Sequence, residues 1–432
     1  MLSFRNISVA VCVFVLGCYG QNALAAGSGA YSVETPDAGA FGMGSAFTGE
    51  ADTPAAIYYN PAGINQMSRP EVSVGDVIIA PRGQMTQPNG NIVHQQNNEY
   101  NIPNFYVVVP VISNKLTVGL GSGSYWGLGT NWGPNSPLQF AATQTNITDV
   151  DNSLVASYQV TDRWSLAASA DNDFSRIDEG FNFLNPESTI GNVQVKASDD
   201  SWGYRLATMF KINDQNQIGL MYRSRINHTY TGKVSLTGIG STYQGLFGFS
   251  PNFVSNIEYK SVIPQSVVLG YSLKPTTKWT INADVQWTDW SSMKYETLTI
   301  NSATPGESSY FSNINPVSEN WHSVWSETVG TQYSVTDQLR LRFGYFHIGR
   351  GVPDATYNPN IPDSNANGYT TGFGYDLTKN LSLDVAYSLL IYDSRKITNS
   401  VSAGAVSLYT GNVDGKYSEY VNIGLVSLTY KF

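Results

Sequence analysis

The stretch WTINADVQWT, residues 279–288, alternates strictly between apolar and polar side chains. One face carries Trp279, Ile281, Ala283, Val285 and Trp287, and the other carries Thr280, Asn282, Asp284, Gln286 and Thr288. Successive side chains of a β-strand point to opposite sides of a sheet, so a period of two predicts a strand with one apolar face. Its aromatic residues lie at the ends of the segment, where the girdles of a membrane barrel stand.

The same alternation recurs through the rest of the chain, for example over residues 202–210 and 381–391. Short turns alternate with long loops between these segments, as in outer-membrane barrels with short periplasmic turns and long outer loops. The sequence predicts an all-β fold, a 14-stranded antiparallel transmembrane β-barrel over residues 70–432. The expected strands begin near Glu71, Ile102, Lys115, Asn152, Arg163, Ser201, Asn216, Glu258, Thr277, Ser323, Gln338, Asn367, Asn380 and Ser418.

The last strand ends in Phe432, and a terminal aromatic residue of this kind resembles the signal that the barrel assembly machinery reads. Lipid cannot satisfy the hydrogen bonds of a free sheet edge, so we expect this strand to pair with the first one.

The composition supports a membrane-facing surface. Only 13% of the 432 residues are charged, whereas soluble proteins carry about a quarter. After the N-terminal region there is no apolar run of the roughly 18 residues that a membrane helix needs. The formal net charge of −9, with no basic cluster, argues against nucleic acid as a partner.

The first 25 residues read as a secretory signal peptide, with Arg5 before an apolar centre and Ala23-Leu24-Ala25 as the cleavage site. The predicted destination is the Gram-negative outer membrane. A lipoprotein site at Cys18 is the alternative, although Leu16 fits it poorly. Cleavage after Ala25 would remove Cys12 and Cys18, the only cysteines, and would leave neither a disulfide nor a thiolate metal site.

Residues 38–63, AGAFGMGSAFTGEADTPAAIYYNPAG, are rich in glycine and do not alternate. Glycine permits tight turns and close packing of main chain. The motif Asn60-Pro61-Ala62-Gly63 then closes the stretch, because proline restricts the backbone before it and glycine permits a reversal. We predict that residues 26–69 form a compact N-terminal plug (hatch) inside the barrel.

Three motifs resemble the FadL-like outer-membrane long-chain fatty acid transport family. SAFTGEA followed by YYNPAG is similar to its plug, and IPQSVVLGY at residues 263–271, running on to WTDWSS at 287–292, is similar to a strand pair. IPDS at residues 361–364 with the following hairpin matches a third motif. The family usually has an arginine shortly after that Pro-Asp pair, where this chain has Asn365, Ala366 and Asn367, so the role of that arginine is not carried over.

The resemblance implies a passive channel for long-chain fatty acids or similar hydrophobic molecules, including the aromatic hydrocarbons that related members carry. It implies capture by outer loops, displacement of the plug and lateral exit through a gap at the third strand. The expected surroundings are outer-membrane lipid and lipopolysaccharide. We expect a monomer without cofactor or metal.

The expected third strand places Gly119, Gly121 and Gly123 on one inward face. Glycines on one face leave a groove and weaken a strand. They either make room for the plug or, as the resemblance implies, mark the lateral opening.

Apolar residues of two outer loops could form a groove that captures ligand. Spacings near three and four predict an amphipathic helix through Leu246, Phe247, Phe249, Phe253, Val254 and Ile257. Phe181, Phe183 and Leu184 belong to the preceding outer loop. Exposed apolar patches often mark binding sites, but these loops could instead bury each other.

Five arginines fall on polar strand faces and are candidates for binding a carboxylate head group: Arg205, Arg223, Arg225, Arg340 and Arg342. The forked guanidinium group can bond both carboxylate oxygens. The alternative is that they pair with inward acids such as Asp284 and Asp384.

No catalytic residue is predicted. No Gly-x-Ser-x-Gly motif occurs, and His94, His228, His322 and His347 are far apart in the sequence. A barrel lipid hydrolase is one remaining alternative. A general porin or adhesin is another, although a porin lumen is an open aqueous channel that a plug would obstruct.

Overall fold

The computed structural model describes residues 36–300, 304–312, 316–398 and 413–432. The predicted signal peptide, both cysteines and residues 26–35 of the predicted plug lie outside the described residues. Within them, no helix combines the length and the apolar character needed to cross a membrane.

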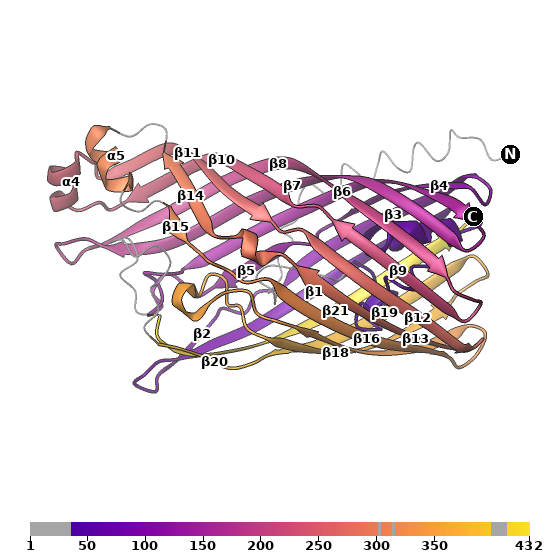
Figure 1. Cartoon of the computed structure of the whole chain (residues 1–432). Helices are drawn as coiled ribbons and strands as arrows, with labels where there is room; N and C mark the ends of the chain where they lie inside the picture. Colours follow the sequence, from indigo (N-terminus) through magenta and orange to yellow (C-terminus); the bar gives the residue numbers. More distant parts are fainter. Residues whose placement is uncertain (1–35, 301–303, 313–315, 399–412) are drawn as a thin grey trace.

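Fourteen antiparallel strands close into a barrel, as predicted (Figure 1). The last strand pairs with the first from Glu71 and Lys431 to Thr86 and Lys416, which closes the wall. In chain order the wall consists of β1 (Glu71–Thr86), β3 (Tyr100–Ile112), β4 (Leu116–Gly123) with β5 (Gly127–Asn131), β6 (Gln144–Thr161), β7 (Trp164–Leu184), β8 (Ile190–Lys211), β9 (Asn216–Arg223) with β10 (Ile226–Thr237), β11 (Asn252–Ile263) with β12 (Ser266–Thr276), β13 (Trp279–Thr288) with β14 (Tyr295–Ile300), β16 (Val324–Ser334), β17 (Leu339–Ile348), β18 (Ala366–Asp376), β19 (Leu381–Tyr392) and β21 (Gly415–Lys431).

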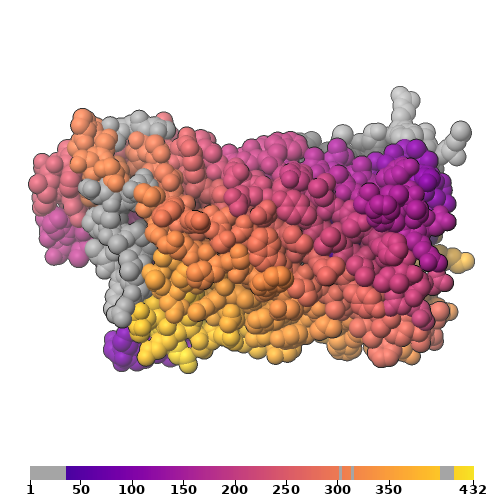
Figure 2. Space-filling view, viewed as in Figure 1, coloured from indigo at the N-terminus to yellow at the C-terminus, as the bar shows by residue number. Residues whose placement is uncertain are grey.

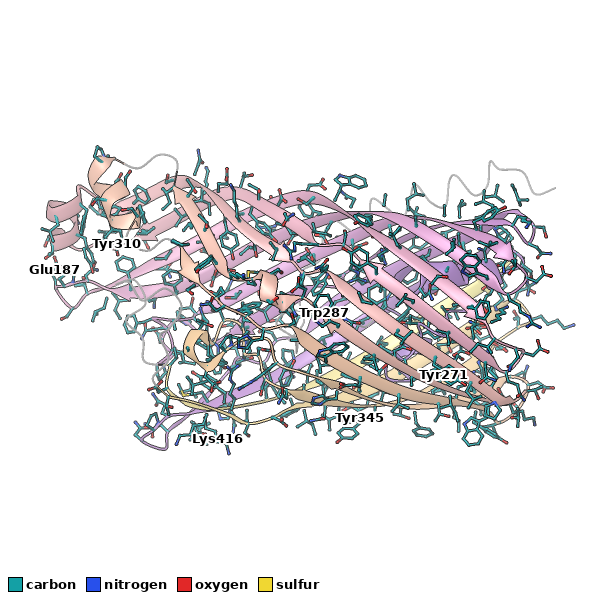
Figure 3. The ribbon with its side chains drawn as sticks, viewed as in Figure 1. Glu187, Tyr271, Trp287, Tyr310, Tyr345 and Lys416 are labelled. Atoms are coloured by element: carbon teal, nitrogen blue, oxygen red, sulfur yellow. The ribbon has the colours of Figure 1, made fainter. Side chains whose placement is uncertain are left out.

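Over a length that matches the thickness of the lipid bilayer, these strands turn their apolar side chains outward. Trp202 is 66% exposed, and Trp279 and Val285 are also exposed, while their polar neighbours face the lumen. Tyr271 and Tyr345, labelled in Figure 3, belong to the same outward set. In the space-filling view this wall forms a continuous surface (Figure 2).

Several strands extend further on the outer side than the sequence predicts. The strand expected near Ser201 begins at Ile190, and the strand expected near Glu258 begins at Asn252. In β8 the apolar face changes sides, because Val193 and Ala197 are buried inside whereas Trp202 points outward. The strand therefore continues beyond lipid, where its apolar residues face the lumen.

Residues 36–69, which we call the lumenal segment, lie inside the barrel toward the end that carries the short turns (Figure 1). The segment contains α2 (Ala38–Phe41), α3 (Ala56–Tyr59) and the 3₁₀ turn η2 (Pro61–Gln66). Asp37 caps α2 by accepting from the Ala40 amide at 2.8 Å. Asn60 accepts from the Ala62 amide at 3.1 Å and donates to the Thr48 carbonyl at 2.9 Å. This arrangement is consistent with the predicted plug.

The opposite end carries the long loops and small elements. These are α4 (Ser241–Phe247), α5 (Pro305–Ser312), the 3₁₀ turns η3 (Trp290–Ser292) and η4 (Asp354–Thr356), and the short strands β2 (Ile92–His94), β15 (Val317–Ser318) and β20 (Arg395–Ile397). The predicted helix through residues 246–257 is wrong. Helix α4 ends at Phe247, and Phe253, Val254 and Ile257 belong to β11, because Gly248 leaves the helix with a positive φ of 78°.

Candidate functional site

The main chain of the lumenal segment packs directly on glycines of the wall. A Cβ atom on Gly219 would lie 2.0 Å from the Thr48 carbonyl oxygen, and one on Gly330 would lie 2.1 Å from the Met43 carbonyl oxygen. A Cβ on Gly344 would lie 2.2 Å from the Gly44 nitrogen. Glycine inside a strand often marks the close approach of another backbone. These glycines were not among the predicted site residues, although their interruption of alternating strands could have identified them.

Two lumen-facing side chains of the wall hold the same segment by hydrogen bonds. Asp284 accepts from the amides of Phe47 and Thr48 at 3.0 and 2.8 Å, and Thr370 accepts from the Gly44 amide at 3.0 Å. The sequence analysis offered Asp284 as a partner for an arginine, but this acid binds the main chain of the lumenal segment.

Four of the five candidate arginines are paired with other aspartates. Arg205 is fully buried and bonds both oxygens of Asp171 at 2.6 and 2.9 Å. It also donates to the Ile57 carbonyl oxygen at 3.0 Å, which ties the wall to the lumenal segment. The other pairs are Arg225 with Asp289, Arg340 with Asp376 and Arg342 with Asp384.

Arg223 differs from the other four. Its side chain is 6% exposed, yet among the described residues it forms no ion pair, and its Nε atom has no hydrogen-bond partner. The guanidinium carbon lies 4.7 Å from the ring centre of Tyr58, 5.6 Å from that of Tyr125 and 5.9 Å from that of Trp126. Arg223 also lines a small cavity of about 30 Å³. Aromatic faces stabilise the cation while leaving its donors available for an anion.

The third strand of the wall is interrupted. Strand β4 pairs with β3 as far as Ser122 and Phe105, whereas β5 pairs with β6 alone among the described strands. Between β4 and β5, Tyr125 and Trp126 are buried. The stretch 100–104 of β3 therefore has no strand partner on the side of β5, which leaves a gap in the hydrogen-bonded wall.

Tyr100 lies over this gap. A Cβ atom on Gly129 of β5 would be 2.4 Å from Cζ of the Tyr100 ring, and Tyr100 is 7% exposed. The Tyr100 ring therefore packs against β5 beside the gap.

The three predicted glycines lie between this gap and the lumenal segment. A Cβ atom on Gly119 or Gly121 would lie 2.8 Å from the Ile57 side chain, and one on Gly123 would lie 3.2 Å from the Tyr125 ring. Gly119 and Gly121 therefore contact the segment, and Gly123 ends β4 beside the interruption. The contacts with Ile57 fit the first alternative, in which these glycines make room for the segment, and the lateral opening stays a prediction.

The aromatic residues predicted for ligand capture mostly bury each other. Phe181, Phe183, Phe249 and Phe253 are between 2% and 6% exposed. Phe249 packs on Tyr310 of α5 with ring centres 5.5 Å apart, and Phe253 packs on Phe311 at 5.6 Å. Tyr310 is labelled in Figure 3. Of the predicted set, Leu246 and Val254 are largely exposed, at 69% and 59%. Tyr310 and Phe311 were not predicted, because they lie in a short helix with no apolar periodicity.

His228 is fully buried between two carboxylates. Its Nδ1 atom lies 3.0 Å from Asp199, and its Nε2 atom lies 3.3 Å from Asp173. Because both ring nitrogens face acids, this histidine is not positioned to activate a serine as a hydrolase would require.

A closed barrel with an apolar exterior and an occupied lumen defines an integral protein of the outer membrane. The chain belongs to the family described as outer membrane protein transport protein (OMPP1/FadL/TodX), whose model matches residues 20–432.

Relatives include a long-chain fatty acid transport protein of Escherichia coli, 23% identical over 85% of this chain and 88% of that protein. Outer membrane protein P1 of Haemophilus influenzae is 21% identical over 92% of this chain and 96% of that protein. A match to a putative outer membrane protein of Neisseria meningitidis, 26% identical, covers 56% of this chain and about half, 53%, of that protein.

Solved structures share the fold. A FadL homologue of Pseudomonas aeruginosa superposes with a TM-score of 0.82 at 21% identity, covering 93% of this chain and all, 100%, of that chain. The Pseudomonas putida toluene transporter TodX gives a TM-score of 0.71 at 18% identity, covering 94% of this chain and 99% of that chain. The homologues are transport proteins rather than enzymes.

Proposed function

We propose that this protein takes up hydrophobic molecules passively across the outer membrane and releases them sideways through the gap between β3 and β5. The interrupted pairing of the third strand carries this proposal. A relative named for long-chain fatty acid transport and a neighbour named for toluene transport support the ligand class. Sideways release into hydrocarbon spares an apolar molecule from crossing water.

The route begins at the outer loops, where Leu246 is exposed beside the buried aromatic residues. It continues through the lumen to the aromatic residues around Arg223 and then to the gap. In this proposal the plug, residues 26–69, blocks the lumen and yields at its N-terminal end. The protein acts as a monomer, in contact with lipid and lipopolysaccharide, after insertion by the barrel assembly machinery.

The variant Tyr100→Cys tests the exit. Removing the ring leaves the gap open, so cells that express the variant should take up labelled oleate or toluene at least as fast as the parent. A bulky methanethiosulfonate reagent on the new thiol should then stop uptake, and a reductant should restore it. The chain's own cysteines lie in the predicted signal peptide, so the reagent has one target in the mature protein.

Tyr420→Cys serves as the matched control, because Tyr420 is 47% exposed on the outward face of β21. Its modification by the same reagent should leave uptake unchanged. If the Tyr100→Cys variant transports equally well before and after modification, the ligand leaves by another route. Bulky residues at Gly121 make a less direct test, because they would also press on Ile57 of the lumenal segment.

Substitution of Arg223 provides a test that distinguishes fatty acids from aromatic hydrocarbons as ligands. We propose that its free guanidinium group binds the carboxylate of a fatty acid in transit. Arg223→Gln should lower oleate uptake by about tenfold, the loss expected for one charge-assisted hydrogen bond, and should leave toluene uptake unchanged. Equal oleate uptake by parent and variant would mean that the head group is held elsewhere.

A further inference from the structure

A second cavity, of about 90 Å³, lies on the outer side of the lumen, bounded by β6, β7, β10, β11 and β14 and by the loops before β16 and β18. Carboxyl groups line it from four elements: Asp149 on β6, Glu179 on β7, Glu296 on β14 and Glu319 in the loop before β16. Neither lysine nor arginine is among the residues that line this cavity.

Several oxygen atoms that line this cavity have no hydrogen-bond partner among the described residues. Asp149 is 1% exposed, and neither of its carboxylate oxygens has a hydrogen-bond partner. The Thr145 hydroxyl and the Asn360 side-chain oxygen, which line the same cavity, are also buried without partners. Buried polar groups are normally satisfied, so a set of unpartnered acceptors in one cavity indicates a missing donor.

Within the part of the chain that the structure describes, the three glutamates of the cavity receive only neutral donors. Asn360 donates to Glu179, the Tyr259 hydroxyl donates to Glu296, and the Trp321 indole donates to Glu319 at 2.8 Å. Burial, with the charge of Glu296 as the next cause, raises the pKa of Glu319 to about 9. A cation placed among these groups would therefore stabilise their ionised forms, whereas a further carboxylate would be repelled.

The remaining walls suit the apolar part of an organic molecule. Tyr230, Tyr259 and Trp321 line the cavity together with isoleucine and valine side chains. Aromatic faces beside carboxylates attract ammonium groups through the ring quadrupole and through charge.

We propose that this cavity binds the protonated amino group of a small amphiphilic amine. The amine would donate to the unpartnered acceptors and rest its alkyl part on the aromatic and aliphatic walls. The inference rests on the proposed function in one respect, because it makes the cavity a binding site along the path that hydrophobic ligands take through the barrel. The route then offers two polar sites of opposite charge, an anion site at Arg223 and this cation site nearer the outer loops.

Calorimetric titration of the full chain in non-ionic detergent at about pH 8 tests the proposal, with hexylamine, hexanol and hexanoate as matched probes. Hexylamine should bind about tenfold more tightly than hexanol, and hexanoate, which can bind at Arg223, should not compete with hexylamine. Glu319→Gln and Glu296→Gln should each weaken hexylamine about tenfold. Glu99→Gln, which alters a glutamate whose side chain is 66% exposed, should bind like the parent.

The variant Ser261→Lys retains all four carboxyl groups that line the cavity. Ser261 lines the cavity, so a lysine there would place a tethered ammonium group among the carboxylates and should abolish hexylamine binding. Retention of the heat-modifiable mobility of folded barrels would establish that each variant is folded.

Three results would overturn the proposal: displacement of hexylamine by hexanoate, unchanged hexylamine affinity in folded Glu319→Gln and Ser261→Lys, or displacement of hexylamine by Ca²⁺ at equal concentration. The outcome is separable from the proposed function. Uptake of oleate or toluene without hexylamine binding would remove only this site, whereas hexylamine binding without uptake of any hydrophobic molecule would remove the transport proposal.

Discussion

Arg205 is the residue whose loss should destabilise the barrel most among the five candidate arginines. Arg205→Gln would leave Asp171 and Asp151 buried near each other without their cation and would remove a donor to the Ile57 carbonyl. Breaking a buried ion pair from one side costs about 3–5 kcal/mol. We expect that loss in the free energy of unfolding, measured by guanidinium titration in lipid vesicles.

Arg340→Gln is the matched control, because the Arg340–Asp376 pair is partly exposed, at 21% and 30%. Exposed pairs contribute about 1 kcal/mol or less, so this variant should unfold almost like the parent. Equal losses at both positions would show that burial does not decide the contribution of these pairs.

The register of the strands decides which of the five arginines forms no ion pair among the described residues. The sequence does not reveal this register. By sequence pattern the five arginines are equivalent, but Arg225 lies between β9 and β10 with its side chain 40% exposed, so its predicted place on a polar strand face is wrong. Arg205 meets Asp171 because Ser169 is opposite Arg205 in the β7–β8 ladder, which places Asp171 one diagonal step away. Arg223, opposite Arg205 in the next ladder, meets aromatic rings from the lumenal segment and from the interruption instead.

Among the secondary-structure elements, strands were predictable wherever contact with lipid imposes one alternation of apolar and polar side chains. Period-two alternation located β13, β16 and β19 to within two residues, because apolar side chains there must face hydrocarbon. The pattern fails beyond the lipid. In β8 and β11 the apolar face turns inward to meet the loop aromatics, so Phe253 and Ile257 resembled a helix although they lie on one face of a strand.

The third strand of the wall has a feature that the linear sequence does not reveal. Three glycines on one face predicted weakness, but the point where pairing with β3 ends is visible only in the ladders of β4 and β5. Gly129, whose added Cβ would meet the Tyr100 ring, lies on β5, beyond the interruption that follows these glycines. Close contacts between a glycine and a distant aromatic ring become visible only when the strands are placed side by side.

For the whole molecule, closure and strand number followed from an even set of segments with alternating short and long connections. The position of the lumenal segment did not follow from them. Its docking depends on glycines in four separate wall strands, Gly219, Gly270, Gly330 and Gly344, that contact its main chain. A glycine-rich stretch before a barrel predicts a compact insert, but the matching surface is distributed over residues far apart in the sequence.

The lumenal segment should be the barrier to ions if it acts as the plug that we propose. In the double variant Gly330→Leu with Gly344→Leu, the added side chains would occupy the space of Met43 and Gly44, so the segment cannot dock there while the wall can still close. Planar bilayers should then show steady conductance that the parent lacks.

Gly424→Leu is the matched control, since a Cβ at Gly424 meets nothing within 4 Å, and it should conduct like the parent. If hydrogen exchange shows the segment released in the double variant while conductance stays at the parental level, the outer loops rather than the segment close the pore. Steady conductance in the parent itself would instead support the porin alternative, because an open aqueous lumen conducts without any displacement.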